Sequence, residues 1–259
     1  MHIKTVKFFL TKYYLLKTTV IAEIGSNWEG STIIAEKIIR KCKDAGADAV
    51  KFQMWRAQDL YSTSHPHWDV IKKSELTFEK AEKIKKIAKK IGIEFICSAF
   101  YPEAVRFLET IQVKRYKVAS RTCLLKDPFS YETLQSKAKT KKPAIISMGM
   151  GGDKQRIKKI FAKNDVTFCY CISEYPLDFN RIDWSDAVKY DGFSDHTLGI
   201  TAPLVFTVLK KQRNSKTIII EKHVKDKSSK GPDASTSIDT DQLAELISHI
   251  RLIEKAKIP

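Results

Sequence analysis

The chain has 259 residues, of which 43% are hydrophobic, and its 46 basic and 30 acidic residues give a formal net charge of +16. This length is close to the ~250 residues typical of one (β/α)8 barrel, and the hydrophobic content is sufficient for one buried core. No apolar run reaches the ~18 residues that a membrane-spanning helix needs, so we expect no membrane partner.

The basic surplus is spread along the chain. Lysines recur in helix-like stretches such as residues 83–90 and 137–142, which is typical of solvated helix faces. We therefore expect no nucleic-acid partner. The alternative, a nucleic-acid binder driven by the +16 charge, predicts a steep salt dependence of binding to duplex.

Residues 1–17 precede the repeating pattern and mix lysines with apolar residues. Lys12 interrupts the apolar stretch and no small-residue cleavage site follows, so a secretory signal peptide is not expected. We interpret this segment as an extension that caps the barrel floor, and residues 18–259 as a single barrel domain. Five cysteines, an odd number without paired C-x-x-C spacing, indicate a reducing compartment, and we expect a cytoplasmic protein.

From residue 18 onward, eight apolar, β-branched runs stop at polar residues, and helix-like stretches of roughly 10 to 15 residues separate them. The alternation predicts an α/β fold, a (β/α)8 TIM barrel, whose active site lies where the strands end. Ser31 and Thr77 are candidate helix N-caps, and Gly46 and Gly92 follow the last turns of the same helices. The runs stop at Glu23, Lys51, Cys97 with Ser98, Lys117, Ser147, residues 169–173, residues 194–196 and residues 221–223.

Lys51 and Lys117 end predicted strands instead of lying on helix faces. Together with the serines at other strand ends, they describe a site for a phosphate or a carboxylate, because such anions need cationic and hydroxyl donors.

His196 and His223 lie at the ends of the predicted seventh and eighth strands, which are neighbours in a barrel. Both imidazoles are therefore placed to reach one cation. The alternative is that each histidine forms a hydrogen bond with a strand-end carboxylate, since two histidines alone do not define a metal site.

Seven short motifs near these strand ends occur in order, and with them the chain resembles the sialic acid synthase family over about residues 19–240. The resemblance implies a TIM-barrel enzyme that condenses phosphoenolpyruvate with an N-acyl hexosamine, such as N-acetylmannosamine or a related aldose. The implied products are a nonulosonic acid and phosphate, formed by C–O cleavage with the help of a divalent metal, Mn²⁺ or Mg²⁺. The motifs are AEIGSN (22–27), AVKFQ (49–53), KVAS (117–120), SMGM (147–150), SDHTLG (194–199), EKH (221–223) and GPD (231–233).

The resemblance also implies roles for individual residues. The metal ligands are His196 and His223. The catalytic residues near the reacting carbons are Glu23, Lys51, Gln53, Lys117 and His196. Phosphoenolpyruvate is bound by Lys51, Ser98, Lys117, Ser120, Ser147 and Ser194. The sugar is bound by Thr122, Tyr175 and Asp233.

Several departures from the family pattern fall on the sugar side. Trp28 stands where members usually carry His, which replaces an imidazole by a stacking surface, and Thr122 stands where Glu is frequent. Ala234 follows Asp233 in place of a frequent His. We therefore expect the phosphoenolpyruvate half of the site to be retained and the acceptor to differ.

Family members normally continue into a small antifreeze-like domain that covers a partner's active site. This chain stops at Pro259, so we expect that domain to be absent, either because the sequence is shortened or because the protein is naturally without it. Arg121 or the loop over residues 65–68 would then supply the cover, and a homodimer is compatible with the resemblance. The remaining alternative is a catalytically impaired barrel that binds an anionic ligand or a partner protein; the intact lysines and histidines argue against it.

Overall fold

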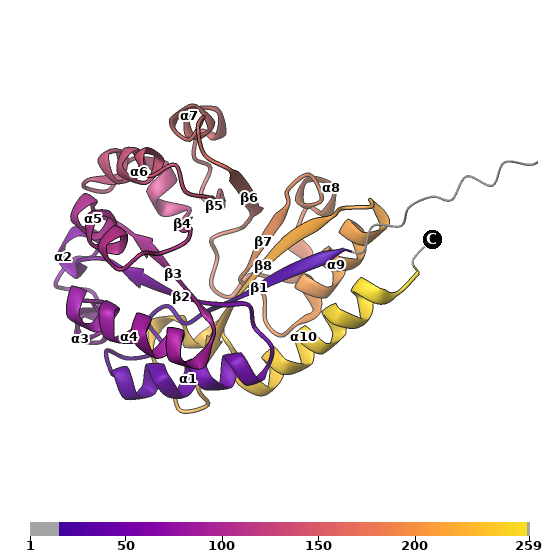
Figure 1. The fold of residues 1–259 in the computed structure, drawn as a ribbon, viewed down its shortest axis with the longest axis horizontal. Helices are drawn as coiled ribbons and strands as arrows, with labels where there is room; N and C mark the ends of the chain where they lie inside the picture. Colours follow the sequence, from indigo (N-terminus) through magenta and orange to yellow (C-terminus); the bar gives the residue numbers. More distant parts are fainter. Residues whose placement is uncertain (1–15, 258–259) are drawn as a thin grey trace, which may run out of the picture.

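The computed structural model describes residues 16–257, so nearly all of the predicted extension over residues 1–17 lies outside the described residues. Eight parallel strands follow one another around a closed sheet, because β1 pairs with both β2 and β8. This closure, with helices outside it, confirms the predicted TIM barrel (Figure 1). The strands are β1 (Lys17–Glu23), β2 (Ala49–Met54), β3 (Glu94–Ala99), β4 (Tyr116–Val118), β5 (Ala144–Ser147), β6 (Val166–Tyr170), β7 (Gly192–Asp195) and β8 (Thr217–Lys225), and the short β9 (Ile238–Asp239) pairs with the end of β8.

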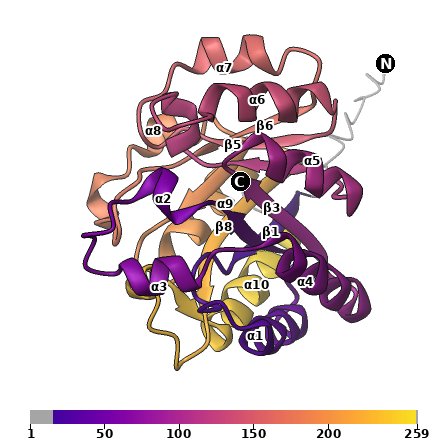
Figure 2. The same ribbon diagram turned by 90° about the vertical axis from the view of Figure 1, so that its left-hand side faces the viewer.

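The helices surround the barrel and cover the outer face of its sheet (Figure 2). They are α1 (Thr32–Asp44), α2 (Ala57–Leu60), α3 (Trp68–Lys73), α4 (Phe78–Ile91), α5 (Pro102–Thr110), α6 (Ser130–Lys139), α7 (Lys154–Ile160), α8 (Trp184–Ala187), α9 (Thr201–Gln212) and α10 (Thr240–Lys255). Short 3₁₀ helices are η1 (Arg121–Leu124), η2 (Phe179–Arg181) and η3 (Pro232–Ser235).

The predicted helix boundaries are confirmed. The side chains of Ser31 and Thr77 accept hydrogen bonds from the first turns of α1 and α4. Gly92 is the C-cap of α4 with φ +79°, and Gly46, with φ +91°, directly follows the C-cap of α1. These left-handed conformations favour glycine and end the two helices before the next strands.

Alternate strand residues point into the barrel. An apolar layer inside it consists of Ile21, Ala49, Ile96, Ile145, Cys169 and Ile219. Side chains two residues farther along a strand point the same way, so polar residues stand above this layer toward the carboxyl ends of the strands.

The prediction that strands stop at Lys51 and His223 is wrong. β2 continues to Met54 and β8 to Lys225, so both residues are inward-facing positions within their strands. A charged or polar side chain interrupts the apolar pattern without ending the strand, because backbone pairing continues on both sides of it.

The seam between β1 and β8 closes the barrel. Its register runs from Lys17 opposite Thr217 to Glu23 opposite His223. The end of α10 adds to this seam, because Glu254 accepts a hydrogen bond from the Thr18 amide at 2.5 Å. Among the helices of residues 16–257, none is long and apolar enough to cross a membrane.

Candidate active site

The barrel mouth holds a cavity of about 310 Å³ at the carboxyl ends of the strands. Most of the predicted site residues line it, although they are scattered over more than 200 residues of sequence. They are Glu23, Lys51, Gln53, Lys117, Ser120, Ser147, Tyr175, Ser194, His196, His223 and Asp233.

Two predicted residues do not line the cavity. Ser98 is buried inside the barrel beside Lys117, and Thr122 is buried in η1. Neither hydroxyl has a hydrogen-bond partner among the described residues. Both lie next to cavity residues, Ser98 in register with Gln53 and Lys117, and Thr122 directly after Arg121, but both are buried and neither lines the cavity.

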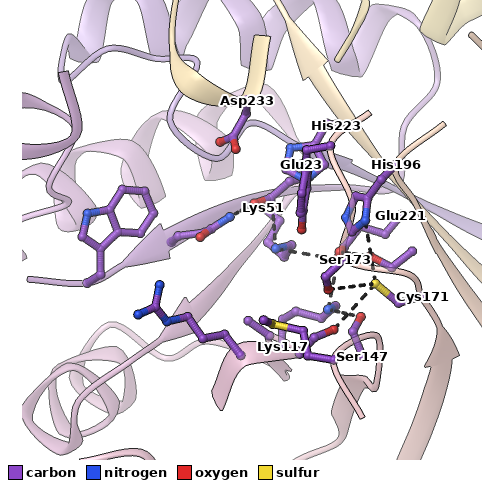
Figure 3. A pocket seen from close by; sticks show the side chains of 18 of the residues that line it. Glu23, Lys51, Lys117, Ser147, Cys171, Ser173, His196, Glu221, His223 and Asp233 are labelled. Atoms are coloured by element: carbon purple, nitrogen blue, oxygen red, sulfur yellow. Dashed lines mark hydrogen bonds and ion pairs between the residues drawn. The ribbon is translucent and has the colours of Figure 1, made fainter. Parts of the chain in front are cut away.

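A network of two lysines and two carboxylates occupies the floor of the cavity (Figure 3). The Lys51 ammonium lies 2.7 Å from Glu23 and 3.7 Å from Glu221, and the Lys117 ammonium lies 3.4 Å from Glu221. All four side chains are almost completely buried. The two lysines predicted for the anion site are therefore paired with two carboxylates, and Glu221 bridges them.

The two carboxylates of this network differ in their affinity for a proton. Burial raises the pKa of Glu23 to about 7, against the opposing effect of Lys51. Burial acts on Glu221 in the same sense, but Lys117 and Lys51 outweigh it and hold the pKa of Glu221 down at about 2. Glu23 is the member of the pair that exchanges a proton near neutral pH, and with Glu23 protonated the network carries a net positive charge.

Three serine hydroxyls line the same cavity as the Lys117 ammonium. Ser147 Oγ lies 2.7 Å from it, and Ser194 donates to Glu221 at 2.8 Å. Ser120 Oγ accepts from the Gly149 amide at 2.9 Å. This wall offers the ammonium and hydroxyl donors that a phosphate or carboxylate needs.

The two histidines face the cavity. Nδ1 of His196 lies 2.7 Å from the Ile172 carbonyl oxygen, which can only accept, so Nδ1 carries a proton. Burial lowers the pKa of His196, but the Cys171 thiol and the Ile172 carbonyl outweigh burial and raise it above its usual value. Burial lowers the pKa of His223 to about 3, and its Nδ1 is buried with no hydrogen-bond partner within residues 16–257. The ring centroids are 5.4 Å apart.

This donor set fits a divalent metal that takes its remaining ligands from substrate and water. Across residues 16–257 no group of three or more His, Cys, Asp or Glu side chains is placed to hold a metal by itself. The partner of His196 is a main-chain carbonyl, so the alternative of a carboxylate partner is wrong for this residue.

Tyr175 and Asp233 lie on the histidine side of the mouth. The Tyr175 ring is centred 4.1 Å from the His196 ring. Asp233, on η3, accepts from the Ser26 amide at 2.9 Å and from the Ser26 hydroxyl at 2.7 Å. Gly25 has φ +52°, and a Cβ there would lie 2.5 Å from the Asp233 carboxylate, so glycine is required for this close approach.

The expectation that Trp28 supplies a stacking surface to the site is wrong. Its indole is fully buried and packs edge-on against Phe52, with ring centroids 6.2 Å apart. It belongs to the apolar layer outside the barrel. A large ring so close to a strand end gains more from burial there than from exposure at the mouth.

Several residues of the cavity were not predicted. Glu221 and Cys171 face the mouth because each lies two residues from an inward-facing strand residue, His223 and Cys169 respectively. That spacing was a usable signal. Trp55, Tyr61 and Phe100 form part of the opposite wall, and no local pattern marks them, because loops bring them there.

Arg121 lines the same wall but does not reach out as a cover. Its guanidinium donates to both oxygens of Asp127, at 2.6 and 2.8 Å, and to the Leu60 carbonyl at 2.8 Å. It therefore ties η1 to the end of α2. Residues 65–68, the other predicted cover, do not line the cavity.

The mouth of this closed (β/α)8 barrel combines paired lysines and carboxylates with two imidazoles, and the relatives described below make the protein a carbon–carbon bond-forming transferase of the class that joins phosphoenolpyruvate to a sugar. The chain belongs to the NeuB family, whose model matches residues 38–258.

Named relatives and a solved structure agree with this membership. An uncharacterized protein of Methanocaldococcus jannaschii is 35% identical, over 92% of this chain and 71% of its own length. The N,N'-diacetyllegionaminic acid synthase of Campylobacter jejuni is 32% identical, over 93% of this chain and 77% of its own. The crystal structure of the N-acetylneuraminic acid synthetase of Leptospira borgpetersenii, in complex with citrate, superimposes with a TM-score of 0.82 at 26% identity, covering 92% of this chain and 84% of that one.

Proposed function

We propose that the protein condenses phosphoenolpyruvate with an N-acyl hexosamine, N-acetylmannosamine or a related aldose, to give a nonulosonic acid and phosphate in a metal-dependent reaction. The observation that carries the proposal is the buried network of Glu23, Lys51, Glu221 and Lys117 beside His196 and His223 in one cavity. All five cysteines are free, which supports a cytoplasmic location.

Phosphoenolpyruvate is assigned to the lysine side. Its phosphate and carboxylate would be held by Lys51, Lys117 and the hydroxyls of Ser120, Ser147 and Ser194. With Glu23 protonated the network has a surplus positive charge, and an anion that replaces Glu221 as partner of an ammonium restores the balance. Ser98 is buried and does not line the cavity, so it is left out of this contact.

The sugar is assigned to the other side, where Asp233 and Tyr175 offer a carboxylate and a hydroxyl to its polar groups. Thr122 is left out, because its hydroxyl does not reach the mouth. His196 and His223 would hold Mn²⁺ or Mg²⁺, and such an ion polarises a carbonyl oxygen as a Lewis acid.

The chemistry joins C3 of phosphoenolpyruvate to the aldehyde carbon of the sugar. Water then adds to C2 and the bond between C2 and the bridging phosphate oxygen breaks, so that the oxygen leaves with the phosphate. Glu23, hydrogen-bonded to Gln53 at 2.5 Å, is placed to take the proton of that water. Its raised pKa suits this role, because a base works best near the operating pH.

Phosphate release tests the proposal. Purified protein should release phosphate only when phosphoenolpyruvate, an N-acyl hexosamine and Mn²⁺ or Mg²⁺ are all present, and EDTA should stop it. Bridging ¹⁸O in phosphoenolpyruvate should appear in the phosphate. Lys117→Met should lower kcat/KM by about 100-fold or more, whereas Lys114→Met, an exposed lysine three residues away, should not change it.

Two outcomes would contradict the proposal. One is the absence of phosphate release across a panel of N-acyl and N,N'-diacyl hexosamines with either metal. The other is release without any sugar, which would indicate a phosphatase. Binding of phosphoenolpyruvate without turnover would instead favour the impaired barrel.

A further inference from the structure

Lys137 of α6 is a buried cation without a carboxylate. Its side chain is 1% exposed, and its ammonium group donates to the carbonyl oxygens of Ala99 at 2.9 Å and Lys117 at 3.1 Å. It forms no ion pair with any carboxylate in the described part of the chain. Burying a cation is unfavourable, so the two carbonyl contacts must serve something an apolar side chain cannot supply.

The two carbonyls lie on opposite sides of a weak seam in the barrel. β3 and β4 share one register pair, Ser98 opposite Lys117, while β2 and β3 share six. α6 packs against this side of the barrel, close to β4 and β5 (Figure 1). One ammonium group has three donors and can bridge both strands, so Lys137 connects β3 to β4 where the backbone ladder is short.

The contact reaches the active site through Lys117. Lys137 holds its main-chain carbonyl from outside the barrel, and the Lys117 side chain points inward, to Ser147 at 2.7 Å and Glu221 at 3.4 Å. β4 has only three residues; it pairs with β5 at all three but with β3 at only one, so the Lys137 contact adds to the shorter of the two pairings beside Lys117.

We propose that Lys137 is a positioning residue for the anion-binding side of the site. By joining the ends of β3 and β4 it fixes the backbone of Lys117 and with it the place of the Lys117 ammonium group. The identity of the anion as phosphoenolpyruvate rests on the proposed function.

The surroundings of Lys137 also make its charge labile. Burial lowers the pKa of Lys137 to about 7, and the positive charges of Lys117 on β4 and Lys51 on β2 act in the same sense. The other titratable neighbours are Cys97 on β3 and Cys123 on η1. Burial raises the pKa of these thiols to about 12 and about 11, so they stay neutral and do not compensate. The bridge should therefore weaken as the pH rises through neutrality.

Two variants of similar size test the hydrogen-bond donors of the Lys137 ammonium group. Lys137→Met removes them, and Lys137→Gln, of nearly the same size, keeps a neutral amide donor. Lys210→Met is the matched control, because Lys210 of α9 is also buried and bonds to the Val188 carbonyl and to Asp191, which precede β7 at the opposite end of the barrel. For each variant, kcat and the KM values for phosphoenolpyruvate and the sugar are measured per folded molecule.

Lys137→Met should raise the KM for phosphoenolpyruvate about tenfold or more, because small displacements of a binding group are costly, and should leave the sugar KM within about twofold. The KM for phosphoenolpyruvate of Lys137→Gln should lie between the values of the unmodified protein and of Lys137→Met. In the unmodified protein the KM for phosphoenolpyruvate should rise from about pH 6 to about pH 8 relative to the Gln variant, which has no titrating group at position 137; Glu23 titrates in both proteins, so its effect cancels in the comparison. Lys210→Met should lower the Tm without changing either KM.

Equal changes of both KM values, or an equal effect of Lys210→Met, would overturn the proposal. If Lys137→Met does not fold, the pH profile of the Gln variant decides. Should the unmodified protein show no turnover, the proposed function fails by itself, and calorimetric titration with inorganic phosphate still tests Lys137: weaker phosphate binding in the Gln variant but not in Lys210→Met supports the positioning role, and equal binding in all three refutes it.

Discussion

Glu23 changes its protonation state in the pH range where the enzyme is expected to work. One of its oxygens lies against Lys51 and the other accepts from Gln53, while burial raises the pKa to about 7. Below that pH the carboxyl group is protonated and cannot take a proton from water. Above it, the carboxylate can act as a base, but its charge opposes a bound anion.

Turnover should therefore rise with pH. We expect kcat at saturating substrates to increase through about pH 7 as Glu23 ionises, and Glu23→Gln to lower kcat by about 100-fold or more and to remove this inflection. The measurement is a pH profile of kcat for both proteins. An unchanged inflection in Glu23→Gln would mean that another group supplies the base.

At the level of single residues, the sequence was informative where the strand period applied. The inward positions of Lys51, Ser194 and His223 follow from alternation along buried strands, and alternation also places Lys222 outside the barrel, where it pairs with Asp195 at 2.6 Å. Alternation alone does not show which inward side chains reach the cavity, and Ser98, although buried inside the barrel, does not line it. Pairing of the lysines with Glu221 depends on neighbours across the barrel, which a single sequence does not reveal.

The loop that carries the site residue Asp233 is held in place by the buried carboxylate of Asp226. The loop after β8 leads to η3 and Asp233, and Asp226 at its start is 4% exposed. Asp226 pairs with Lys37 at 2.9 Å and Lys41 at 3.1 Å, one turn apart on α1. The loop is thus fastened to the outer helix layer before it crosses the mouth.

The ion pairs of Asp226 with Lys37 and Lys41 should be lost at low pH. The Lys37 hydrogen bond holds the pKa of Asp226 well below its usual value, so the stabilisation is fully present above the unfolded-state pKa of about 4 and is lost as the pH falls below it. We expect Asp226→Asn to lower the free energy of unfolding by about 1–2 kcal/mol at pH 7, since both lysines are partly in water. Urea unfolding of both proteins between about pH 7 and pH 2 measures the difference, which should stay constant down to about pH 5 and shrink below about pH 4.

Asp241→Asn provides the control. Asp241 also pairs with a lysine, Lys227, at 2.6 Å, but its side chain is 75% exposed. Its removal should leave the urea midpoint nearly unchanged at every pH. A pH-independent difference for Asp226→Asn would show that shape, and not charge, fastens the loop.

The elements were easier to predict than their exact ends. Helices α1 and α4 were defined by caps and period, because both are local properties of the chain. The continuation of β2 past Lys51 could not be predicted from local sequence, because it depends on pairing with β3. The wall formed by Trp55, Tyr61 and Phe100 depends on where two loops meet, which is a property of the folded barrel.

At the scale of the whole molecule, the fold class was predictable because the αβ alternation and the chain length both point to one barrel. The sequence pattern did not show how the barrel sheet closes on itself. β1 and β8 pair along the whole of β1, and Arg251 and Glu254 of α10 bond to both backbone groups of Thr18.

This closure makes the starting point of the chain arbitrary, so the barrel should tolerate circular permutation. Joining residue 257 to residue 16 by a Gly/Ser linker of about eight residues, and opening the chain in the exposed loop between Thr63 and Ser64, should keep Tm and turnover near those of an unpermuted chain of residues 16–257. Thermal unfolding and phosphate release measure both. A permutant opened within β4, between Lys117 and Val118, should lose turnover, because there the cut falls on the thinnest seam and on the lysine that faces the anion. The eight βα units form a closed ring, so new chain ends should be tolerated in loops away from the catalytic and binding residues.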